Sequence, residues 1–156
     1  MEPRPAKHAD LPALAQLWHD AWHEAHTAHL PEDFTSQRTV HSFQTRLSDA
    51  GDALRMIGTA TTALGLCIIN EDEIDAIFVA PDARGTGVAA ILLADGEARL
   101  KASGIQNAHL ICLIQNLRAA RFYEKSGWLQ IGTIKDPLQT PSGVVEVECR
   151  VFRKPL

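Results

Sequence analysis

The sequence predicts a mixed α/β domain with the element order βααβββαβαββ. Apolar residues recur every three or four positions along most of the first fifty residues, which is typical of helices. Beyond Gly51 they form short runs between polar turns, which is typical of strands, and two later segments return to helical composition. With 156 residues, 46% of them hydrophobic, the chain suffices for one hydrophobic core, so we expect a single domain over residues 1–156.

The N-terminal third is expected to contain a short extended segment, over residues 4–8, and two helices. Asp10 is a residue type preferred at a helix N-cap, and the apolar stripe over residues 11–25 predicts a helix that ends near residue 30. Thr35 or Ser36 is then expected to cap a second, weaker helix that runs to residue 50.

Three strands are expected next, over residues 54–61, 63–70 and 73–80. The turns between them are short and polar, so the strands form an antiparallel meander. A long helix follows over residues 86–103, with Gly104 where a C-terminal cap belongs. The remaining elements are a strand over 109–114, a helix over 117–126 closed by Gly127, and strands over 128–135 and 144–152.

Composition and charge exclude several functional classes. No segment is long and apolar enough to span a membrane, and the first residues lack the apolar core of a signal peptide, so we expect a cytoplasmic protein. Cys67, Cys112 and Cys149 lie far apart in strand-like runs, which favours buried free thiols. A net charge of -4 argues against nucleic acid as a partner and mildly favours a cationic acceptor.

An arginine and two glycines mark the junction before the long helix, in the segment Arg84-Gly85-Thr86-Gly87. Amides in the first turn of a helix have no partner inside the helix, and glycines let an anion approach them closely. The segment therefore predicts either an anion cradle or an ordinary turn. A Walker loop is excluded because no Gly-Lys-Ser or Gly-Lys-Thr follows the glycines.

Two motifs together resemble one family. Arg84-x-x-Gly87-x-Ala89 is similar to the Arg/Gln-x-x-Gly-x-Gly/Ala segment of the GCN5-related N-acetyltransferase (GNAT) superfamily. The segment NLRAARFYEKSGW, residues 116–128, resembles the second cofactor segment of that family, in which an Asn, a small residue and a Tyr precede a Gly-aromatic pair. The resemblance implies a GNAT-like, mostly antiparallel central sheet with helices on both faces.

The resemblance also implies a site for acetyl-CoA as co-substrate, with no metal. In the family, the strand before the glycine junction splays from its neighbour, and the pantetheine arm enters the V-shaped opening. The cofactor-binding residues implied here are the backbone of Phe78 and Val79, the junction Arg84, Gly85, Thr86, Gly87, Val88, Ala89 and Ala90, and the second segment's Asn116, Ala119 and Tyr123.

Catalytic roles are expected for one phenol and one carboxylate. The family transfers the acetyl group directly to an amine, and Tyr123 matches its general acid, although a half-buried core aromatic is the alternative. Asp75, or less favourably Glu73, is the candidate general base. Both carboxylates are otherwise solvated strand residues, and a β-bulge would change which of them faces inward.

Four histidines share one side of the first helix: His19, His23, His26 and His29. They could bind a metal, line the acceptor site, or form a solvated helix face. In the family the first two helices cover the acceptor side. The substrate-binding residues implied by the resemblance are Trp22, His23, His26 and Phe34, with core packing as the alternative for the tryptophan.

We therefore expect an N-acetyltransferase that moves an acetyl group from acetyl-CoA to a primary amine, on either a small molecule or a peptide. A non-catalytic acyl-CoA-binding module is the alternative from another functional class, and a domain without any CoA site is a third. No nucleic acid or membrane partner is expected. The alternating final strand and Trp128 could form the edge of a homodimer.

Overall fold

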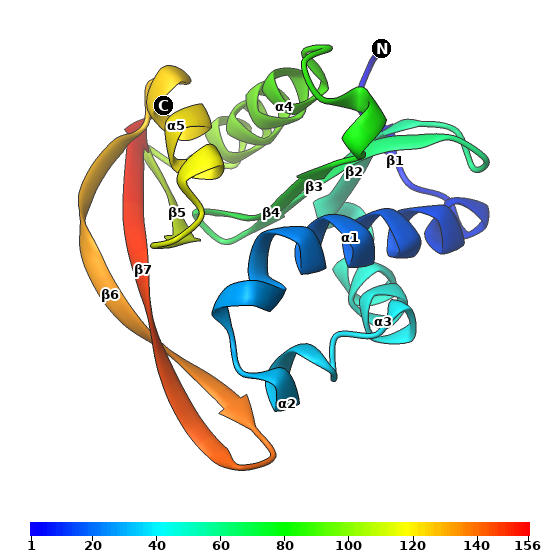
Figure 1. Ribbon diagram of the computed structural model, residues 1–156. Coiled ribbons are helices and arrows are strands. Elements are labelled where there is room, and N and C mark those ends of the chain that lie inside the picture. The colour runs from blue at the N-terminus through cyan, green and yellow to red at the C-terminus, as the bar shows by residue number, and fades with distance from the viewer.

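The computed structural model describes residues 1–156 and has the element order βαααβββαβαββ (Figure 1). Its elements are β1 (Arg4–Pro5), α1 (Leu11–His26), α2 (Glu32–Thr35), α3 (Val40–Ala50), β2 (Leu54–Gly58), β3 (Ala63–Asn70), β4 (Glu73–Val79), α4 (Val88–Ala102), β5 (Asn107–Leu113), α5 (Leu117–Lys125), β6 (Leu129–Thr140) and β7 (Gly143–Pro155). The predicted mixed α/β class is confirmed.

The strands form one seven-stranded sheet in the order β1-β2-β3-β4-β5-β7-β6. Every neighbouring pair is antiparallel except β4 and β5, which run parallel, so the expected mostly antiparallel sheet and its meander of β2, β3 and β4 are confirmed. Figure 1 shows α1 and α3 over one face of the sheet and α4 and α5 over the other.

The predicted order lacked one element, the single turn of helix α2. The expected caps Thr35 and Ser36 lie at the C-terminal end of α2, where Thr35 is buried. Helix α3 begins later, because Thr39 is its N-cap and accepts a hydrogen bond from the Ser42 amide at 3.1 Å. A capping residue type recurs three times within five positions here, so composition alone did not identify the true cap.

Asp10 stands directly before α1, as expected, but its side chain does not cap that helix. Its carboxylate accepts hydrogen bonds from the Arg4 guanidinium at 2.8 and 2.9 Å and from the Lys7 amide at 2.7 Å. Arg4 also donates to the carbonyl of Gly58 at 3.1 Å. Asp10 is 2% exposed, so this carboxylate fastens β1 and the start of α1 to the edge of the sheet.

We expect Asp10→Asn to lower the free energy of unfolding by about 2 kcal/mol at neutral pH, because it removes a buried charge with three donors. The loss is smaller than for a fully buried pair, since the Arg4 side chain is 35% exposed. The hydrogen bonds from Arg4 hold the pKa of Asp10 below its ordinary value, and the Lys7 amide contributes in the same direction. The stabilisation is therefore present above about pH 4 and is lost as the pH falls through the folded-state pKa.

Urea denaturation of both proteins at pH 7 and at successively lower pH measures this difference. The two unfolding curves should converge in acid. A constant difference at all pH values would show that the substitution acts through packing rather than through the charge.

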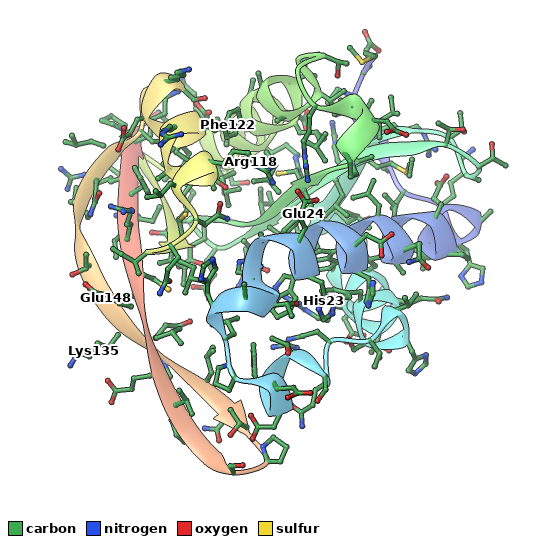
Figure 2. All side chains as sticks on the ribbon, viewed as in Figure 1. His23, Glu24, Arg118, Phe122, Lys135 and Glu148 are labelled. Atoms are coloured by element: carbon green, nitrogen blue, oxygen red, sulfur yellow. The ribbon has the colours of Figure 1, made fainter.

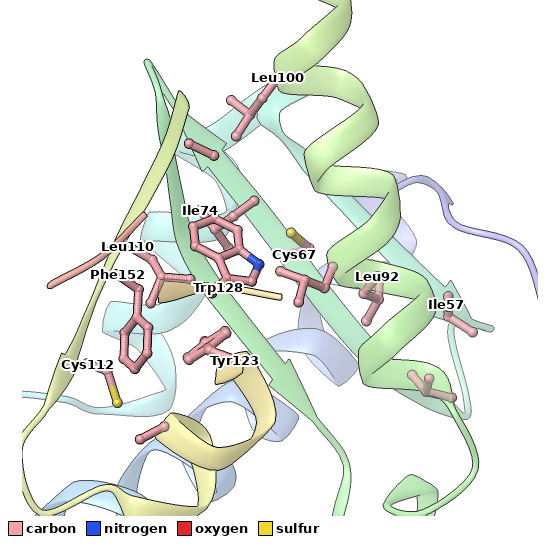
Figure 3. Packing of buried hydrophobic residues seen from close by; sticks show 14 of the residues in the cluster. Ile57, Cys67, Ile74, Leu92, Leu100, Leu110, Cys112, Tyr123, Trp128 and Phe152 are labelled. Atoms are coloured by element: carbon pink, nitrogen blue, oxygen red, sulfur yellow. The ribbon is translucent and has the colours of Figure 1, made fainter. Parts of the chain in front are cut away.

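Two apolar clusters hold the layers together. The cluster between the sheet and helices α4 and α5 includes Tyr123, Trp128 and Phe152, and Figure 3 shows these aromatic side chains gathered beside α5. The cluster on the other face is built around Trp18 and Phe43, whose ring centroids lie 4.9 Å apart. The sheet is therefore buried on both faces, which fixes its position against four helices.

Strands β6 and β7 form a long hairpin that extends beyond the rest of the sheet toward α2 (Figure 1). Both strands are longer than expected. At the hairpin tip, the Ser142 hydroxyl donates to the Asp33 carboxylate at 2.7 Å. The hairpin is therefore tied to the segment that includes α2.

The expected dimer edge is not present in the form predicted. Trp128 is 3% exposed and belongs to the core, and β7 lies between β5 and β6 rather than at an edge. A strand's alternation reports which of its sides are buried but does not report its place in the sheet order. The edge strand beside β7 is β6, and β1 forms the opposite edge of the sheet.

Cys67, Cys112 and Cys149 are buried and unpaired. Burial raises the pKa of Cys67 to about 12 and that of each of the other two thiols to about 11. All three are therefore thiols rather than thiolates at neutral pH. None of the helices combines the length and the apolar character that a membrane span requires.

Candidate functional site

The candidate site begins where β4 and β5 separate. These parallel strands are paired in register only at Glu73 and His109, and the His109 amide donates to the carbonyl of Asp72 at 2.9 Å. Beyond this point the two strands form no further ladder, although each remains paired with its other neighbour. The opening that results is lined by side chains and backbone from both strands.

A bulge in β4 determines which side chains face each side of this opening. The register with β3 shifts by one residue, so that Ile74 pairs with Ile69 and Ala76 pairs with Ile68. Ile74 therefore packs in the cluster under α4, whereas Ala76 packs in the cluster under α1. Asp75 is the extra residue of the bulge, and it lines a cavity on the α1 side of the sheet.

The first cavity, of about 380 Å³, lies between α1, the end of β4, the glycine junction and α5. Most of the residues that line it are apolar or glycine. The predicted cofactor residues in its wall are Phe78, Val79, Arg84, Gly85, Gly87, Val88, Ala89, Ala90, Asn116, Ala119 and Tyr123. Its volume lies within the usual range of about 300–1,000 Å³ for pockets that bind small molecules and cofactors.

The glycine junction presents unpaired backbone donors to this cavity. The amides of Gly85, Gly87, Val88, Ala89 and Ala90 donate no hydrogen bond within the chain, and all five residues line the cavity. Gly87 is the N-cap of α4, so its end of the helix dipole adds partial positive charge. Such a set of amides is suited to bind a phosphate.

The backbone conformation favours glycine at both Gly85 and Gly87. Their φ angles are +76° and +88°, a region that L side chains rarely adopt. A Cβ atom added at either position would meet no atom of the protein within 4 Å, so it would project into open space. The backbone is therefore bare on the side where an anion would approach, and these residues fit a CoA pyrophosphate.

Thr86 is the exception among the junction residues, since it does not line the cavity. Its hydroxyl donates to the carbonyl of Ala83, and its amide donates to the same carbonyl at 3.3 Å. Thr86 thus holds the turn between the two glycines.

Arg84 is not a free cation. Its guanidinium donates two hydrogen bonds to Glu24 of α1, at 2.8 and 2.9 Å, and Arg118 of α5 lies 3.5 Å from the same carboxylate. These contacts lower the pKa of Glu24, with the bond from Arg84 as the largest cause. Figure 2 shows Glu24 on the side of α1 that faces α5, so one acid joins three elements at the mouth of the first cavity. No local pattern indicates this network, because Glu24 lies sixty residues from Arg84.

Asn116 is the N-cap of α5. Its side-chain oxygen accepts a hydrogen bond from the Ala119 amide at 3.3 Å, and both residues line both cavities. The side-chain nitrogen Nδ2 of Asn116 has no partner within the chain, so it remains available to a ligand, whereas its backbone amide donates to the carbonyl of Leu113 at 2.9 Å.

A second cavity, of about 190 Å³, lies on the α1 side of β4. Its walls include Trp18, Trp22 and His26 from α1, Arg46 from α3, and Asp75 from the bulge. Five residues line both cavities, namely Ile77, Phe78, Asn116, Ala119 and Tyr123. The two cavities therefore meet at the opening between β4 and β5.

Tyr123 is held at this meeting point by aromatic packing. Its ring lies 5.7 Å from Phe152 and 6.3 Å from Trp128, measured between centroids, and the residue is 8% exposed. Burial raises the pKa of the phenol, so it remains protonated at neutral pH. Its hydroxyl forms no hydrogen bond with the rest of the chain, which leaves it free to bond to a ligand.

His26 presents one nitrogen that can accept a proton. Its Nδ1 donates to the carbonyl of Trp22 at 2.8 Å, which leaves the lone pair on Nε2. Burial lowers the pKa of His26, and His29 and His23 lower it further, so the ring is mainly neutral near pH 7.

Three other predicted residues lie outside both cavities: Glu73, His23 and Phe34. His23 bonds instead to the Thr27 hydroxyl and the Arg38 carbonyl, each at 2.7 Å, on the side of α1 that faces α3 (Figure 2). Phe34 is buried, and its ring centroid lies 6.1 Å from that of Trp22, so it packs behind the Trp22 wall of the second cavity. Burial and the neighbouring Asp75 and Asp72 raise the pKa of Glu73, which lies before the bulge at the closed end of the opening.

Sequence reasoning missed Arg46, the basic residue in the wall of the second cavity. It lies one turn after Phe43 and one residue before Leu47, so it flanks the apolar stripe of α3. A long cationic side chain at such a flanking position was the available signal.

Comparisons with known proteins agree with this geometry. The profile described as the acetyltransferase (GNAT) family matches residues 11–128. The fold is similar to a GCN5-related N-acetyltransferase from Rhodopseudomonas palustris, with a TM-score of 0.76 and 18% identity over 99% of this chain and 94% of that one.

Two further structures are similar over nearly their whole length. A ribosomal-protein-alanine N-acetyltransferase from Brucella melitensis gives a TM-score of 0.75 at 17% identity over 100% of both chains. PaiA N-acetyltransferase from Thermoplasma acidophilum, solved in complex with coenzyme A, gives 0.69 at 17% identity over 99% of this chain and 98% of that one. No curated protein sequence matches. At these identities the likeness establishes the fold.

Proposed function

Because this chain belongs to the acetyltransferase (GNAT) family, we propose that it transfers an acetyl group from acetyl-CoA directly to the nitrogen of a primary amine. The observation that carries the proposal is the meeting of two cavities at Tyr123. The first cavity is lined by the free amides at the start of α4. The second is lined by Tyr123 as the candidate acid, Asp75 as the candidate base, and aromatic side chains.

The first cavity would hold the co-substrate. The amides of Gly85 and of Gly87 to Ala90 would bind the pyrophosphate, while Phe78 and Val79 of β4 and Asn116 of α5 would contact the pantetheine arm. The junction amides and the Asn116 side-chain nitrogen have no partners in the chain. Phe78 and Val79 lie on the part of β4 that is not paired with β5. Arg84 and Arg118 would lie beside the phosphates, with Glu24 setting their orientation.

Acetyl-CoA supplies an acetyl thioester when bound. The amine nitrogen forms a bond to the acetyl carbonyl carbon, and the carbon–sulfur bond breaks. The amine loses one proton and the departing sulfur gains one. We assign proton acceptance to Asp75, directly or through water, since it is the carboxylate that the bulge turns into the second cavity. Trp22 and His26 form the wall against which the acceptor lies.

Tyr123 would donate a hydrogen bond to the departing sulfur. Its raised pKa keeps the phenol protonated throughout the neutral range, which suits a donor. It is the only tyrosine in the chain, so no other phenol can take its place.

Calorimetry with CoA and a thioester-consumption screen test this function. The protein should bind CoA, and it should consume acetyl-CoA faster when a primary amine is present, with one free thiol and one amide formed per turnover. The screen should include amino acids, polyamines, other small amines and short peptides. Binding of CoA without turnover on any amine would instead support a non-catalytic acyl-CoA-binding module, and absence of CoA binding would refute both.

A further inference from the structure

The second cavity is lined by charged groups of both signs that are not joined in an ion pair. Asp75 of β4 and Arg46 of α3 both line it and no ion pair joins them, although the charge of Asp75 acts on the Arg46 guanidinium in the direction that raises its pKa. Because the cavity holds only about 190 Å³, it suits a small molecule or the end of a larger one. It can therefore receive a ligand with a positive and a negative group at separate points.

Arg46 is a half-buried cation without an oxygen partner. Its guanidinium lies over the ring of Trp18, with 4.4 Å to the centroid, and 5.7 Å from that of Phe43. This stacking compensates part of the cost of burying the charge but uses none of its five N–H donors. Burial and the nearby charge of Arg38 lower the pKa of Arg46 and the charge of Asp75 partly opposes them, but an arginine remains cationic at neutral pH.

Arg38 has the same character. It precedes α3, is half-buried, and its guanidinium lies 4.7 Å from the ring centroid of Phe34. The guanidinium of Arg38 too donates to no oxygen of the chain. The acceptor side of the molecule therefore holds two such guanidinium groups close enough to influence each other.

Arg38 and Arg46 are the only half-buried arginines whose guanidinium groups donate to no oxygen of the chain. The remaining five each donate to at least one oxygen, and they are Arg4, Arg55, Arg84, Arg99 and Arg150. Every other half-buried guanidinium therefore donates to the chain, and of the two that do not, Arg46 alone lines a cavity and is the one left for a ligand. A guanidinium fork binds carboxylate and phosphate groups with two parallel hydrogen bonds.

We infer that the acceptor is a small amine that also carries an oxyanion group, such as the carboxylate of an amino acid or a phosphonate. This inference rests on the proposed function and adds the acceptor class to it. The oxyanion binds Arg46, with Arg38 adding to the positive potential, and the amine lies toward Asp75 and Tyr123. The overall charge of -4 favoured a cationic acceptor, but the local charges disfavour a polyamine, which would bring further positive charge against two unpaired guanidinium groups.

Matched acceptor pairs test the inference. They are alanine with isopropylamine, β-alanine with propylamine, and 2-aminoethylphosphonate with the same propylamine. The anionic member of each pair should have a kcat/KM at least about 10-fold higher than its neutral partner. Comparing the two amino acids with the phosphonate shows whether the site prefers a carboxylate or a phosphorus oxyanion. Arg46→Met should abolish the preference, lowering kcat/KM for the anionic member about 10- to 100-fold through KM while leaving the KM for acetyl-CoA unchanged.

Two further variants separate the ligand contact from loss of folding. Arg46→Lys retains the charge without the fork and should give an intermediate KM. Arg153→Met removes an equal charge from an exposed position of β7 that lines neither cavity, so it should not change the preference. Thermal unfolding shows whether each variant is folded. If Arg46→Met does not fold, Arg38→Met replaces it in the test and should show a smaller increase in KM for the anionic acceptor.

Calorimetry of the same acceptors with the CoA-saturated protein completes the test. Turnover without a preference for the anionic member, or with a preference that survives Arg46→Met, overturns the inference and leaves the proposed function intact. Arg46-dependent binding of the anionic amines without turnover supports the subsite and overturns the proposed function. Absence of both turnover and Arg46-dependent binding overturns the inference.

Discussion

Replacing Tyr123 with phenylalanine should lower kcat by about 10²- to 10³-fold, the usual loss when one donor to a developing negative charge is removed. The phenol is at the meeting point of the two cavities, and its hydroxyl forms no hydrogen bond with the chain. Phenylalanine preserves the packing against Trp128 and Phe152, so the fold should be unchanged. Steady-state turnover with the best acceptor of the screen measures the effect.

The dissociation constant for CoA and the thermal unfolding midpoint should be the same in Tyr123→Phe and the original protein. A second readout uses the fact that Tyr123 is the only tyrosine. Burial raises its pKa, so phenolate absorbance should appear in the folded protein only at a pH well above the value of about 10 expected for the unfolded chain. Unchanged turnover in Tyr123→Phe would show that Tyr123 is only a core aromatic without a catalytic role. Ionisation of Tyr123 near pH 10 in the folded original protein would show that the phenol is exposed.

The part of the site that could be predicted from sequence is the part that local backbone chemistry determines. The glycine junction combines two positive φ angles with a helix N-terminus. Both requirements can be recognised in the sequence, because they determine residue types within four consecutive positions. The helix after it was expected over residues 86–103 and lies over Val88–Ala102. Asn116 is likewise recognisable because an N-cap and the helix it begins are adjacent in the chain.

The acceptor side depended instead on contacts between distant segments. Asp75 faces the second cavity only because β4 gains one residue relative to β3, and alternation along β4 alone does not locate that bulge. Arg46 becomes a cavity residue because α3 packs against α1. His23 was expected in the same wall, but it bonds to the Arg38 carbonyl fifteen residues away. Helical spacing shows that residues share a side of a helix, but not which neighbour that side meets.

We expect Gly87→Ala to raise the dissociation constant for CoA about 10- to 100-fold. A Cβ atom at this position would stand in the open space beside the free amides of the junction, where the pyrophosphate is expected to approach. If the backbone instead rotates away from its φ of +88° to relieve strain, the amides lose their common direction. Either response removes one or two hydrogen bonds to a charged group, each worth about 1.5–3 kcal/mol, and 1.4 kcal/mol corresponds to tenfold.

Gly104→Ala is the matched control, because the chain has a second glycine at the same φ of +88° at the opposite end of α4. A Cβ there also meets no protein atom within 4 Å, and the residue lines neither cavity. Both substitutions should cost about 1 kcal/mol of stability through left-handed backbone strain, so equal losses in thermal unfolding are expected. Only Gly87→Ala should weaken CoA binding in calorimetry. If both variants weaken it equally, the effect comes from destabilised α4, and the phosphate cradle at Gly87 is refuted.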